Sequence, residues 1–427
     1  MKTFLEEALK KATDTKIFLS EVGAIKKLPQ LLLEHLPGKT FTLIADENTW
    51  KAAGEMVGHT LTEAKIPLTS PVIENFEGTY KSAEQISRII KERATVPIAV
   101  GSGTINDLVK LAAQQNSQPY IVVATAPSVD GYASAGAALL TDGVKMTHPC
   151  NAPAIIIGES AVLSSAPKEL KSAGYADLLA KVPAGGDWLV ADYLGEDPLN
   201  RESWALVQHH LKEFLTIPVD WDNLFKGLTL AGLAMQYQRD SRPVSGGEHL
   251  LSHIWEMEGK TPYLHGHKVG IGTLITTALY TYLLEEGVEG GEPLKPREEV
   301  LKAKLTLLED SFSYLGDLSK MERILQEKYS VTKSQAQRRE SLIEGWPLLQ
   351  EKLRAQLFSY EESEERLKAV GAPTTAREIG LVRETAIEDV RKAQLLRNRY
   401  TILDVIDDLG VLEKALEYLK DGPFLKS

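Results

Sequence analysis

The chain has little of what membrane-bound, secreted or nucleic-acid-binding proteins need. Its 427 residues include one cysteine, Cys150, so no internal disulfide can form and a cytoplasmic location is expected. No run of 18 or more apolar residues occurs, so no membrane span is expected. The formal net charge is −11, which argues against a nucleic-acid partner. The first residues, MKTFLEEALKKAT, have the pattern of an amphipathic helix and not that of a signal peptide.

The pattern of apolar residues indicates two domains. In residues 1–164 short apolar runs alternate with helical patterns, which is typical of an α/β domain with a parallel sheet and helices on both faces. Residues 165–427 are predominantly helical and end in a Glu-, Lys- and Leu-rich extension. The expected strands are Thr40–Ala45, Val72–Asn75, Ile98–Val100, Tyr120–Ala124 and Ala154–Ile157, and the expected helices are Trp50–Ala64, Ser82–Ala94 and Thr104–Gln114.

A glycine-rich turn follows one of these strands. Residues 98–107 read IAVGSGTIND, so an apolar strand runs through Gly101-Ser102-Gly103 into a helix that starts at Thr104. Glycines allow close approach of a phosphate, and free N–H groups at a helix start favour an anion. An ordinary tight turn is the alternative, because Asp107 stands where the dinucleotide fingerprint has its last glycine.

Two further strands end in polar residues. Asp46 follows TFTLIA, where a carboxylate can bind a ribose and repel a 2′-phosphate, which predicts NAD in preference to NADP. The loop Thr125–Gly131 follows YIVVA. In open α/β sheets ligands bind at the carboxyl ends of the strands, so these three loops together predict a nucleotide site.

Four of the nine histidines lie in the stretch SGGEHLLSHIWEMEGKTPYLHGHKVGIG, residues 245–272. His249 and His253 are four residues apart, so they share one face of a helix. Together with a histidine from the following segment, at His265 or His267, they make a plausible site for a divalent metal. Solvated or helix-capping histidines are the alternative.

A carboxylate would complete such a site, and Asp177 in SAGYADLLAK is the candidate. Its apolar neighbours place it near a packed region, where an unpaired carboxylate is costly. A metal held by His249 and His265 would compensate its charge, although an acid that favours the start of a helix is a reasonable alternative.

Together these segments resemble a known family. GSGTIND, TAPSVDGYASAGAAL, AGYADLLAK, SGGEHLLSH and YLHGHKVGIG, in this order, resemble the iron-containing alcohol dehydrogenase superfamily, which includes glycerol dehydrogenase and dehydroquinate synthase. The match is closer to sn-glycerol-1-phosphate dehydrogenases, especially the bacterial form with a long helical C-terminal extension. The resemblance implies a dehydroquinate synthase-like fold with an N-terminal dinucleotide-binding domain, a helical metal-binding domain and a cleft between them.

The resemblance also assigns residues. Asp177, His249 and His265 match the metal ligands, where the family uses zinc, nickel or iron. Asp130 and His253 match residues that contact the substrate, and Asp177 is expected to do the same. Where relatives carry an acid this chain has His267, which leaves the polarity of that side of the site open. The expected NAD(P) contacts are Asp46, Gly103, Thr104, Ile105, Asn106, Asp107, Thr125, Ala126, Pro127, Ser128 and Ser134.

The implied activity is the metal-dependent, NAD-linked interconversion of dihydroxyacetone phosphate and a glycerol phosphate, with NADP as a possible cofactor. A homodimer is expected from the resemblance and because two-fold pairs are the commonest assemblies. The substrate phosphate has no recognisable clamp motif, and its candidate cations are Lys145, Lys181, Arg239 and Arg242. The alternatives are a glycerol or polyol dehydrogenase, a dehydroquinate synthase-like enzyme, and a non-catalytic nucleotide-binding relative.

Overall fold

The computed structural model describes residues 2–141, 144–259, 262–330 and 334–426. The chain forms two compact units, and each is discontinuous in sequence. The first comprises Met1–Leu178 with Glu202–Ser241, and the second Leu179–Arg201 with Arg242–Ser427. Helical residues 165–178 and 202–241 therefore pack with the sheet-containing unit, whereas the sequence pattern alone starts the helical domain at residue 165.

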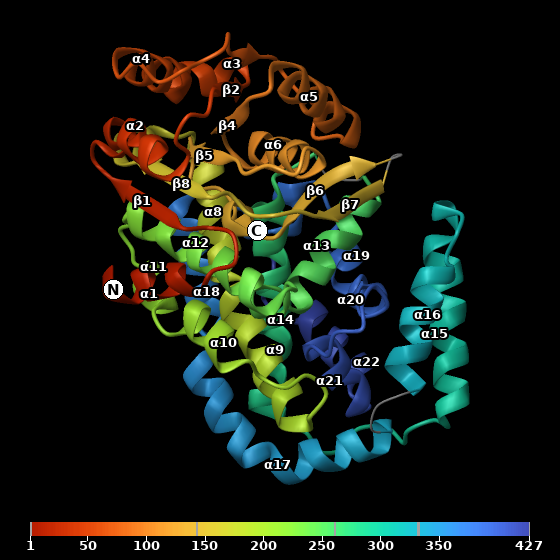
Figure 1. The fold of residues 1–427 in the computed structure, drawn as a ribbon. Helices are drawn as coiled ribbons and strands as arrows, with labels where there is room; N and C mark the ends of the chain where they lie inside the picture. Colours follow the sequence, from red (N-terminus) through yellow and green to blue (C-terminus); the bar gives the residue numbers. More distant parts are fainter. Residues whose placement is uncertain (1, 142–143, 260–261, 331–333, 427) are drawn as a thin grey trace. The chain divides into compact units, whose positions relative to one another are not determined.

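The first unit is built on a six-stranded parallel sheet, as predicted (Figure 1). The strand order is β1-β8-β5-β4-β2-β3, and every pairing is parallel. β1 was not predicted, because IFLSE is a half-buried edge strand that pairs with β8 alone and lacks a clear apolar pattern. The strands are β1 Ile17–Glu21, β2 Phe41–Ala45, β3 Val72–Ile73, β4 Val96–Gly101, β5 Ile121–Ala124 and β8 Ile155–Glu159.

Helices cover this sheet because each buries an apolar stripe against it. Ile25 and Leu28 of one helix and Val57 and Leu61 of another enter the same core as the strand residues. The predicted helix Trp50–Ala64 is interrupted by a π-helical turn, Trp50–Gly54, where the Trp50 ring covers Gly54. The helices are α1 Lys2–Lys11, α2 Ala24–His35, α3 Glu47–Thr49, α4 Glu55–Glu63, α5 Tyr80–Arg93, α6 Gly103–Gln115, α7 Ser160–Ser165, α8 Lys168–Leu179, α10 Arg201–Gln208, α11 Leu211–Phe214 and α12 Trp221–Gln238.

An antiparallel pair of strands, β6 Gly136–Thr141 and β7 Val144–Pro149, accompanies the sheet. This pair was not predicted from the sequence. β6 packs against α6. The pair therefore lies next to the helix that follows the glycine turn, and it follows the loop after β5 in the sequence.

The second unit is helical, as predicted. Its helices are α9 Lys181–Leu194, α13 Gly247–Met257, α14 His265–Glu286, α15 Arg297–Phe312, α16 Ser319–Ser330, α17 Gln335–Gln356, α18 Tyr360–Val370, α19 Arg383–Glu388, α20 Val390–Ala393, α21 Ile402–Asp408 and α22 Leu412–Asp421. α14 is buried along most of its length. A Cβ on Gly272 would lie 2.4 Å from the backbone oxygen of Glu248, so α13 and α14 are in backbone contact at this glycine.

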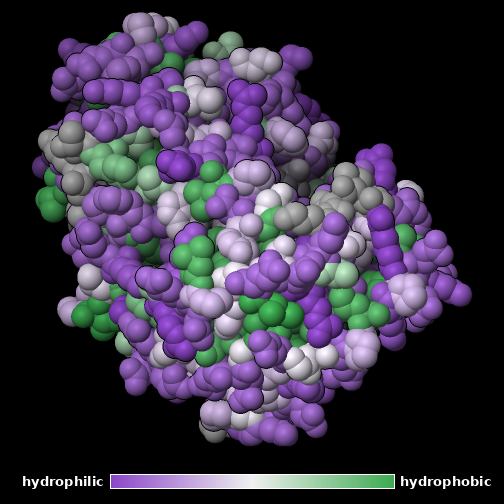
Figure 2. All heavy atoms as spheres, turned by 90° about the horizontal axis from the view of Figure 1, so that it is seen from below, coloured by the Kyte–Doolittle hydropathy of each residue, from purple (hydrophilic) through white to green (hydrophobic). Residues whose placement is uncertain are grey.

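Figure 2 shows one face of the protein, on which hydrophilic residues predominate and apolar residues form small separate groups. Within the part of the chain that the structure describes, no helix is both long enough and apolar enough to cross a membrane.

Candidate functional site

Three predicted nucleotide contacts lie at one edge of the sheet. β2, β4 and β5 are neighbours in parallel, so Asp46, the Gly101–Gly103 turn and the loop that starts at Thr125 all leave the same carboxyl edge. Asp46 caps α3, where one of its carboxylate oxygens accepts a hydrogen bond from the backbone N–H of Thr49 at 2.8 Å. This juxtaposition is what an open α/β sheet offers to a ligand.

The glycine turn is required by packing. A Cβ on Gly101 would lie 2.5 Å from the Cβ of Ile105, and one on Gly103 would lie 3.1 Å from Val129. Ile105 is therefore a buried residue that closes the turn. Thr104, in contrast, is exposed in the first turn of α6, where free backbone N–H groups favour an anionic ligand.

Several predicted cofactor contacts are engaged in internal hydrogen bonds. The amide of Asn106 donates to Gly131 O at 3.4 Å, and Asp107 accepts from the N–H of Ala138 at 3.0 Å. The hydroxyl of Ser134 donates to Gly131 O at 2.9 Å. These side chains hold the loop after β5 and the start of β6 in place. They would therefore contribute to nucleotide binding mainly by positioning the backbone of that loop.

A buried cation that was not predicted from the sequence connects these hydrogen-bonded groups. Lys110 is fully buried, and its Nζ donates to Gly131 O at 2.6 Å, to Gly136 O at 2.9 Å and to Ser134 Oγ at 3.1 Å. Its Nζ also lies 3.4 Å from a carboxylate oxygen of Asp107. The signal available in the sequence was a lysine in the otherwise apolar run LVKLAA.

The loop from Thr125 to Ser134 is also held by close contact with two helices. A Cβ on Gly174 of α8 would lie 1.7 Å from the carbonyl oxygen of Pro127, and one on Gly232 of α12 would lie 2.7 Å from the Cβ of Ala133. The hydroxyl of Tyr132 donates to Ala126 O at 2.7 Å. The predicted residues Thr125, Ala126, Pro127 and Ser128 are all buried. Their backbone is therefore fixed.

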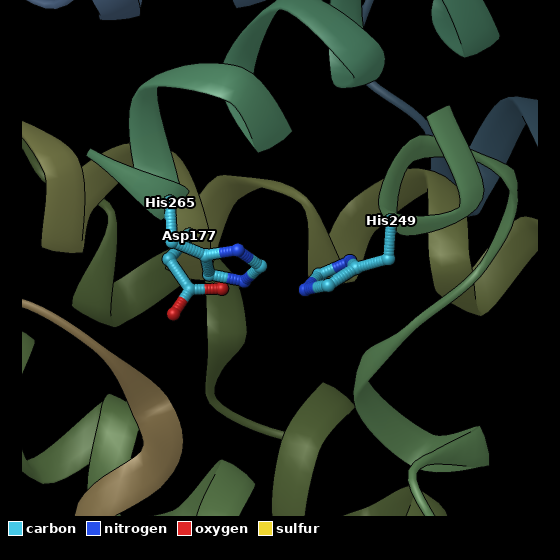
Figure 3. Close-up of side chains that lie close together, drawn as sticks. All are labelled: Asp177, His249 and His265. Carbon is cyan, nitrogen blue, oxygen red and sulfur yellow. The ribbon is translucent and has the colours of Figure 1, made fainter. Parts of the chain in front are cut away.

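Three predicted metal ligands lie together. Asp177 of α8, His249 of α13 and His265 of α14 each offer one ligand atom, and these atoms lie within 4.8 Å of one another (Figure 3). Ligand atoms bonded to one ion at about 2.0–2.2 Å are at most about 4.4 Å apart, so small side-chain shifts suffice to bind an ion. One carboxylate and two imidazoles are a donor set that suits zinc, nickel and iron.

Two carboxylates, which were not predicted from the sequence, orient the histidine rings. Nδ1 of His249 lies 2.8 Å from Glu248 Oε1, and Nδ1 of His265 lies 2.9 Å from Glu256 Oε1. Such contacts favour the tautomer protonated at Nδ1, which carries its lone pair on Nε2. Metal-binding histidines usually have such partners, so these contacts fit a metal. Lys268 Nζ lies 3.3 Å from the same Glu256 oxygen.

The other two predicted catalytic residues adjoin these ligands. The backbone N–H of Asp130 donates to a carboxylate oxygen of Asp177 at 3.0 Å, and the His253 ring lies 6.4 Å from that of His249 between centroids. Burial lowers the pKa of His253 well below its ordinary value, and the positive charge of Arg397 lowers it further. Both effects favour the neutral form of the imidazole. His267 is buried in the first turn of α14.

The candidate cations for the substrate phosphate differ in their exposure to solvent. Lys181 is fully buried, and so is Arg242, whose guanidinium lies 2.9 Å from Asp197 and donates to Asp187 O and Tyr400 O. Burial gives no support to either prediction, because both cations are enclosed in the protein. Arg239 is exposed at the C-terminus of α12, and the side chain of Lys145 lies outside the described residues.

The fold and the donor set define a class. Residues 19–167 match the family model for iron-containing alcohol dehydrogenases. The iron-containing alcohol dehydrogenase of Corynebacterium glutamicum superposes with a TM-score of 0.57 at 14% identity over 95% of each chain. The fold is that of the iron-containing alcohol dehydrogenases.

Curated relatives narrow the class. The glycerol-1-phosphate dehydrogenase [NAD(P)+] of Halalkalibacterium halodurans is 31% identical over 70% of this chain and 80% of its own length. The enzyme of the same name from Bacillus licheniformis is 29% identical over 95% of this chain and 91% of its own. The chain belongs to the glycerol-1-phosphate dehydrogenase family.

Proposed function

We propose that this protein interconverts dihydroxyacetone phosphate and sn-glycerol 1-phosphate by hydride transfer to or from NAD(P). The observation that carries the proposal is the Asp177, His249 and His265 cluster in a chain whose curated relatives are named for this substrate and cofactor. The alternatives considered from the sequence, above all a polyol dehydrogenase, become outcomes of the test.

Asp177, His249 and His265 would hold the divalent metal, and Glu248 and Glu256 would fix the orientation of the two imidazoles. When bound, a metal ion in such a site supplies Lewis-acid polarisation of the substrate oxygen. The protein's part is to keep the donor atoms close together and the histidines in one tautomer.

The carboxyl edge of the sheet is proposed to bind the dinucleotide, which supplies the hydride chemistry. This assigns nucleotide binding to residues 1–164, which also contribute Asp130 to the substrate site, and assigns metal binding and the remaining substrate contacts to residues 165–427. The backbone of Gly103–Asp107 and of Thr125–Ser128 would approach the pyrophosphate and nicotinamide, since both segments are fixed at that edge. Asp46 would receive the ribose and disfavour a 2′-phosphate.

His253 and Asp130 are proposed to act on the substrate. The pKa of His253 is lowered by burial, and its ring lies beside that of His249. The imidazole therefore favours its neutral form, which can accept and pass on a proton of the substrate hydroxyl. Asp130 is anchored to Asp177 through its backbone N–H, which places it next to the metal ligand.

The decisive experiment measures NADH oxidation with dihydroxyacetone phosphate and with dihydroxyacetone, before and after removal of metal with a chelator. A buried charge-assisted contact to phosphate is worth about 1.5–3 kcal/mol, so the phosphorylated substrate should have a kcat/KM higher by at least about tenfold. Chelation should abolish turnover and added metal should restore it. Equal efficiency on both substrates would instead favour a polyol dehydrogenase.

We further propose that the protein is cytoplasmic and forms a homodimer without nucleic acid. The single cysteine and the net charge of −11 support the location and the lack of a nucleic-acid partner. The dimer rests on the prevalence of two-fold pairs. Light scattering that gave a monomer mass at assay concentration would refute the dimer.

A further inference from the structure

Asp187 of α9 is a fully buried acid whose carboxylate joins four helices. One oxygen, Oδ1, accepts hydrogen bonds from the hydroxyl of Tyr280 of α14 at 2.6 Å and from the backbone N–H of Ile402, the first residue of α21, at 2.8 Å. The other oxygen, Oδ2, accepts from the N–H of Gly247, the first residue of α13, at 2.8 Å. Two of the helices joined in this way, α13 and α14, carry the predicted metal-ligating histidines.

The start of α13 lies directly against this carboxylate, because glycine occupies two successive positions there. A Cβ on Gly246 would collide with Asp187 Oδ2. A Cβ on Gly247 would lie 3.1 Å from Thr276 of α14 and 3.2 Å from Leu403 of α21. A carboxylate at the start of a helix binds the free N–H groups through charge-assisted hydrogen bonds, and the helix dipole favours it. Asp187 therefore fixes where the first turn of α13 lies.

The connection from this turn to a metal ligand is short. Glu248 is the next residue after Gly247. Its Oε1 accepts from the N–H of Gly246 at 2.6 Å and lies 2.8 Å from Nδ1 of His249. The acid that orients the His249 ring is thus attached to the same turn that Asp187 holds. A displacement of this turn would move Glu248 and His249 together.

We propose that Asp187 is a positioning residue of the metal site, which holds the first turn of α13 so that the His249 imidazole faces the ion. The assignment rests on the metal-binding role of His249 in the proposed function. Asp187 acts through Glu248, whereas the ring of His265 is oriented by Glu256. A change at Asp187 should therefore affect the His249 side of the site.

The test compares wild type with Asp187→Asn, Tyr280→Phe and the control Asp408→Asn. An amide has a single oxygen, so Asp187→Asn cannot accept hydrogen bonds on both sides, and either orientation leaves a buried donor unmatched. Asp408, the last residue of α21, is a buried acid of the same unit that accepts from Arg338 Nη2 at 2.9 Å and from the hydroxyl of Tyr400 at 2.7 Å. It controls for the loss of a buried carboxylate.

Each protein is titrated with Co²⁺ against a competing chelator, and the visible absorption spectrum of the Co²⁺ form and the melting temperature are recorded. Asp187→Asn should lower the Co²⁺ affinity by about tenfold, the lower end of what partners of metal ligands contribute, and should change the spectrum because one imidazole is misplaced. Tyr280→Phe keeps the carboxylate and removes one donor, so a smaller loss is expected. Asp408→Asn should lower the melting temperature and keep the wild-type affinity and spectrum.

Double variants test the route of the effect. Asp187→Asn combined with Glu248→Gln should cost less Co²⁺ affinity than the two single losses together, because both changes act on His249. Asp187→Asn combined with Glu256→Gln should be nearly additive, because Glu256 acts on His265. Full additivity in the first pair would overturn the proposed route.

Two kinds of result separate the failures. Wild-type affinity and spectrum in Asp187→Asn, or equal losses of affinity in Asp187→Asn and Asp408→Asn, would overturn the positioning role and leave the proposed function in place. If Asp187→Asn does not fold, Tyr280→Phe decides by the same two criteria. A wild-type protein that binds no Co²⁺ and turns over without a metal would overturn the proposed function itself.

Discussion

Nδ1 of His265 lies 2.9 Å from Oε1 of Glu256, and that same oxygen is 3.3 Å from the ammonium group of Lys268. Glu256 is thus a shared acceptor for a candidate metal ligand and a buried cation. The interaction keeps the imidazole in one orientation and one tautomer, which a metal ligand requires. A substitution at Glu256 can therefore test whether His265 binds the metal while His265 itself is kept.

Glu256→Gln should weaken metal binding while leaving all three ligands in place. Partners of this kind typically contribute 10- to 100-fold in metal affinity or activity, so we expect an affinity loss in that range and a smaller loss than in His265→Ala, which should lose the metal and keep the fold. Metal titration against a competing chelator measures both. Glu258→Gln is the control, because Glu258 pairs with Lys392. Undiminished affinity in both Glu256→Gln and His265→Ala would refute the ligand assignment.

Asp46→Gly should reduce the preference for NAD over NADP. Removing the carboxylate removes its repulsion of a 2′-phosphate, and glycine is tolerated at an N-cap at a cost of only a few tenths of a kcal/mol. We expect the ratio of kcat/KM values for the two cofactors to fall by roughly tenfold, which corresponds to about 1.4 kcal/mol. Glu47→Gln, at the exposed adjacent acid, should leave the ratio unchanged. An unchanged ratio in Asp46→Gly would place the ribose elsewhere.

Gly174→Ala should damage the loop after β5. The new Cβ would lie 1.7 Å from the carbonyl oxygen of Pro127, and because both groups belong to backbone-anchored segments, the loop must shift. Overpacking of this kind costs about 1–3 kcal/mol. Urea unfolding and the dissociation constant for NADH should both report it. Gly78→Ala, whose Cβ would meet nothing closer than 3.6 Å, is the matched control, and equal behaviour of the two variants would contradict the prediction.

The stability of the protein should depend on pH through Asp187. Burial raises the pKa of its carboxyl, and repulsion from Glu248 raises it further, while the hydrogen bond from Tyr280 opposes the shift. A raised folded pKa means that the folded state keeps a proton that the unfolded state has lost above its ordinary pKa of about 4. The contribution of this group to stability is therefore greatest at low pH and declines as pH rises through the folded pKa.

Asp187→Asn removes this titration, so the unfolding free energy of the variant should fall less between pH 5 and pH 8 than that of wild type. The largest slope that one group can give is about 1.4 kcal/mol per pH unit. Urea unfolding at several pH values measures it, with the exposed Asp421→Asn as control. Parallel curves for wild type and Asp187→Asn would contradict the shift. Some loss of stability at every pH is expected too, because Asp187 accepts hydrogen bonds from Gly247 N and Ile402 N.

The sheet and the metal-ligand cluster could be predicted from the sequence for physical reasons. Buried parallel strands such as Tyr120–Ala124 are continuous apolar runs, and polar residues that follow them must share one edge. His249 and His265 are marked by their spacing and by the apolar helix that follows. The apolar neighbours of Asp177 made it a candidate for the missing carboxylate. Its assignment together with the two histidines, however, depended on resemblance, because no local pattern relates residues more than 70 positions apart.

Other features had a weak local signal or none. Glu256 and Glu248 look like ordinary helix acids until the fold brings each against an imidazole. Lys110 reads as an amphipathic lysine, yet its partners Gly131 and Gly136 lie on a loop that reaches it only in the folded state. Lys181 and Arg242 were candidates for the substrate phosphate, and the structure encloses both. The sequence does not reveal which charged side chains a helical unit will enclose.

The backbone contact between Gly272 and Glu248 has a consequence for metal selectivity. Because two helices touch there without an intervening side chain, the distance between the backbones that carry His249 and His265 is set by main-chain packing. The carboxylates of Glu248 and Glu256 orient the two imidazole rings. An ion of a different radius would therefore be accommodated by small side-chain movements of the three ligands and not by separation of α13 and α14.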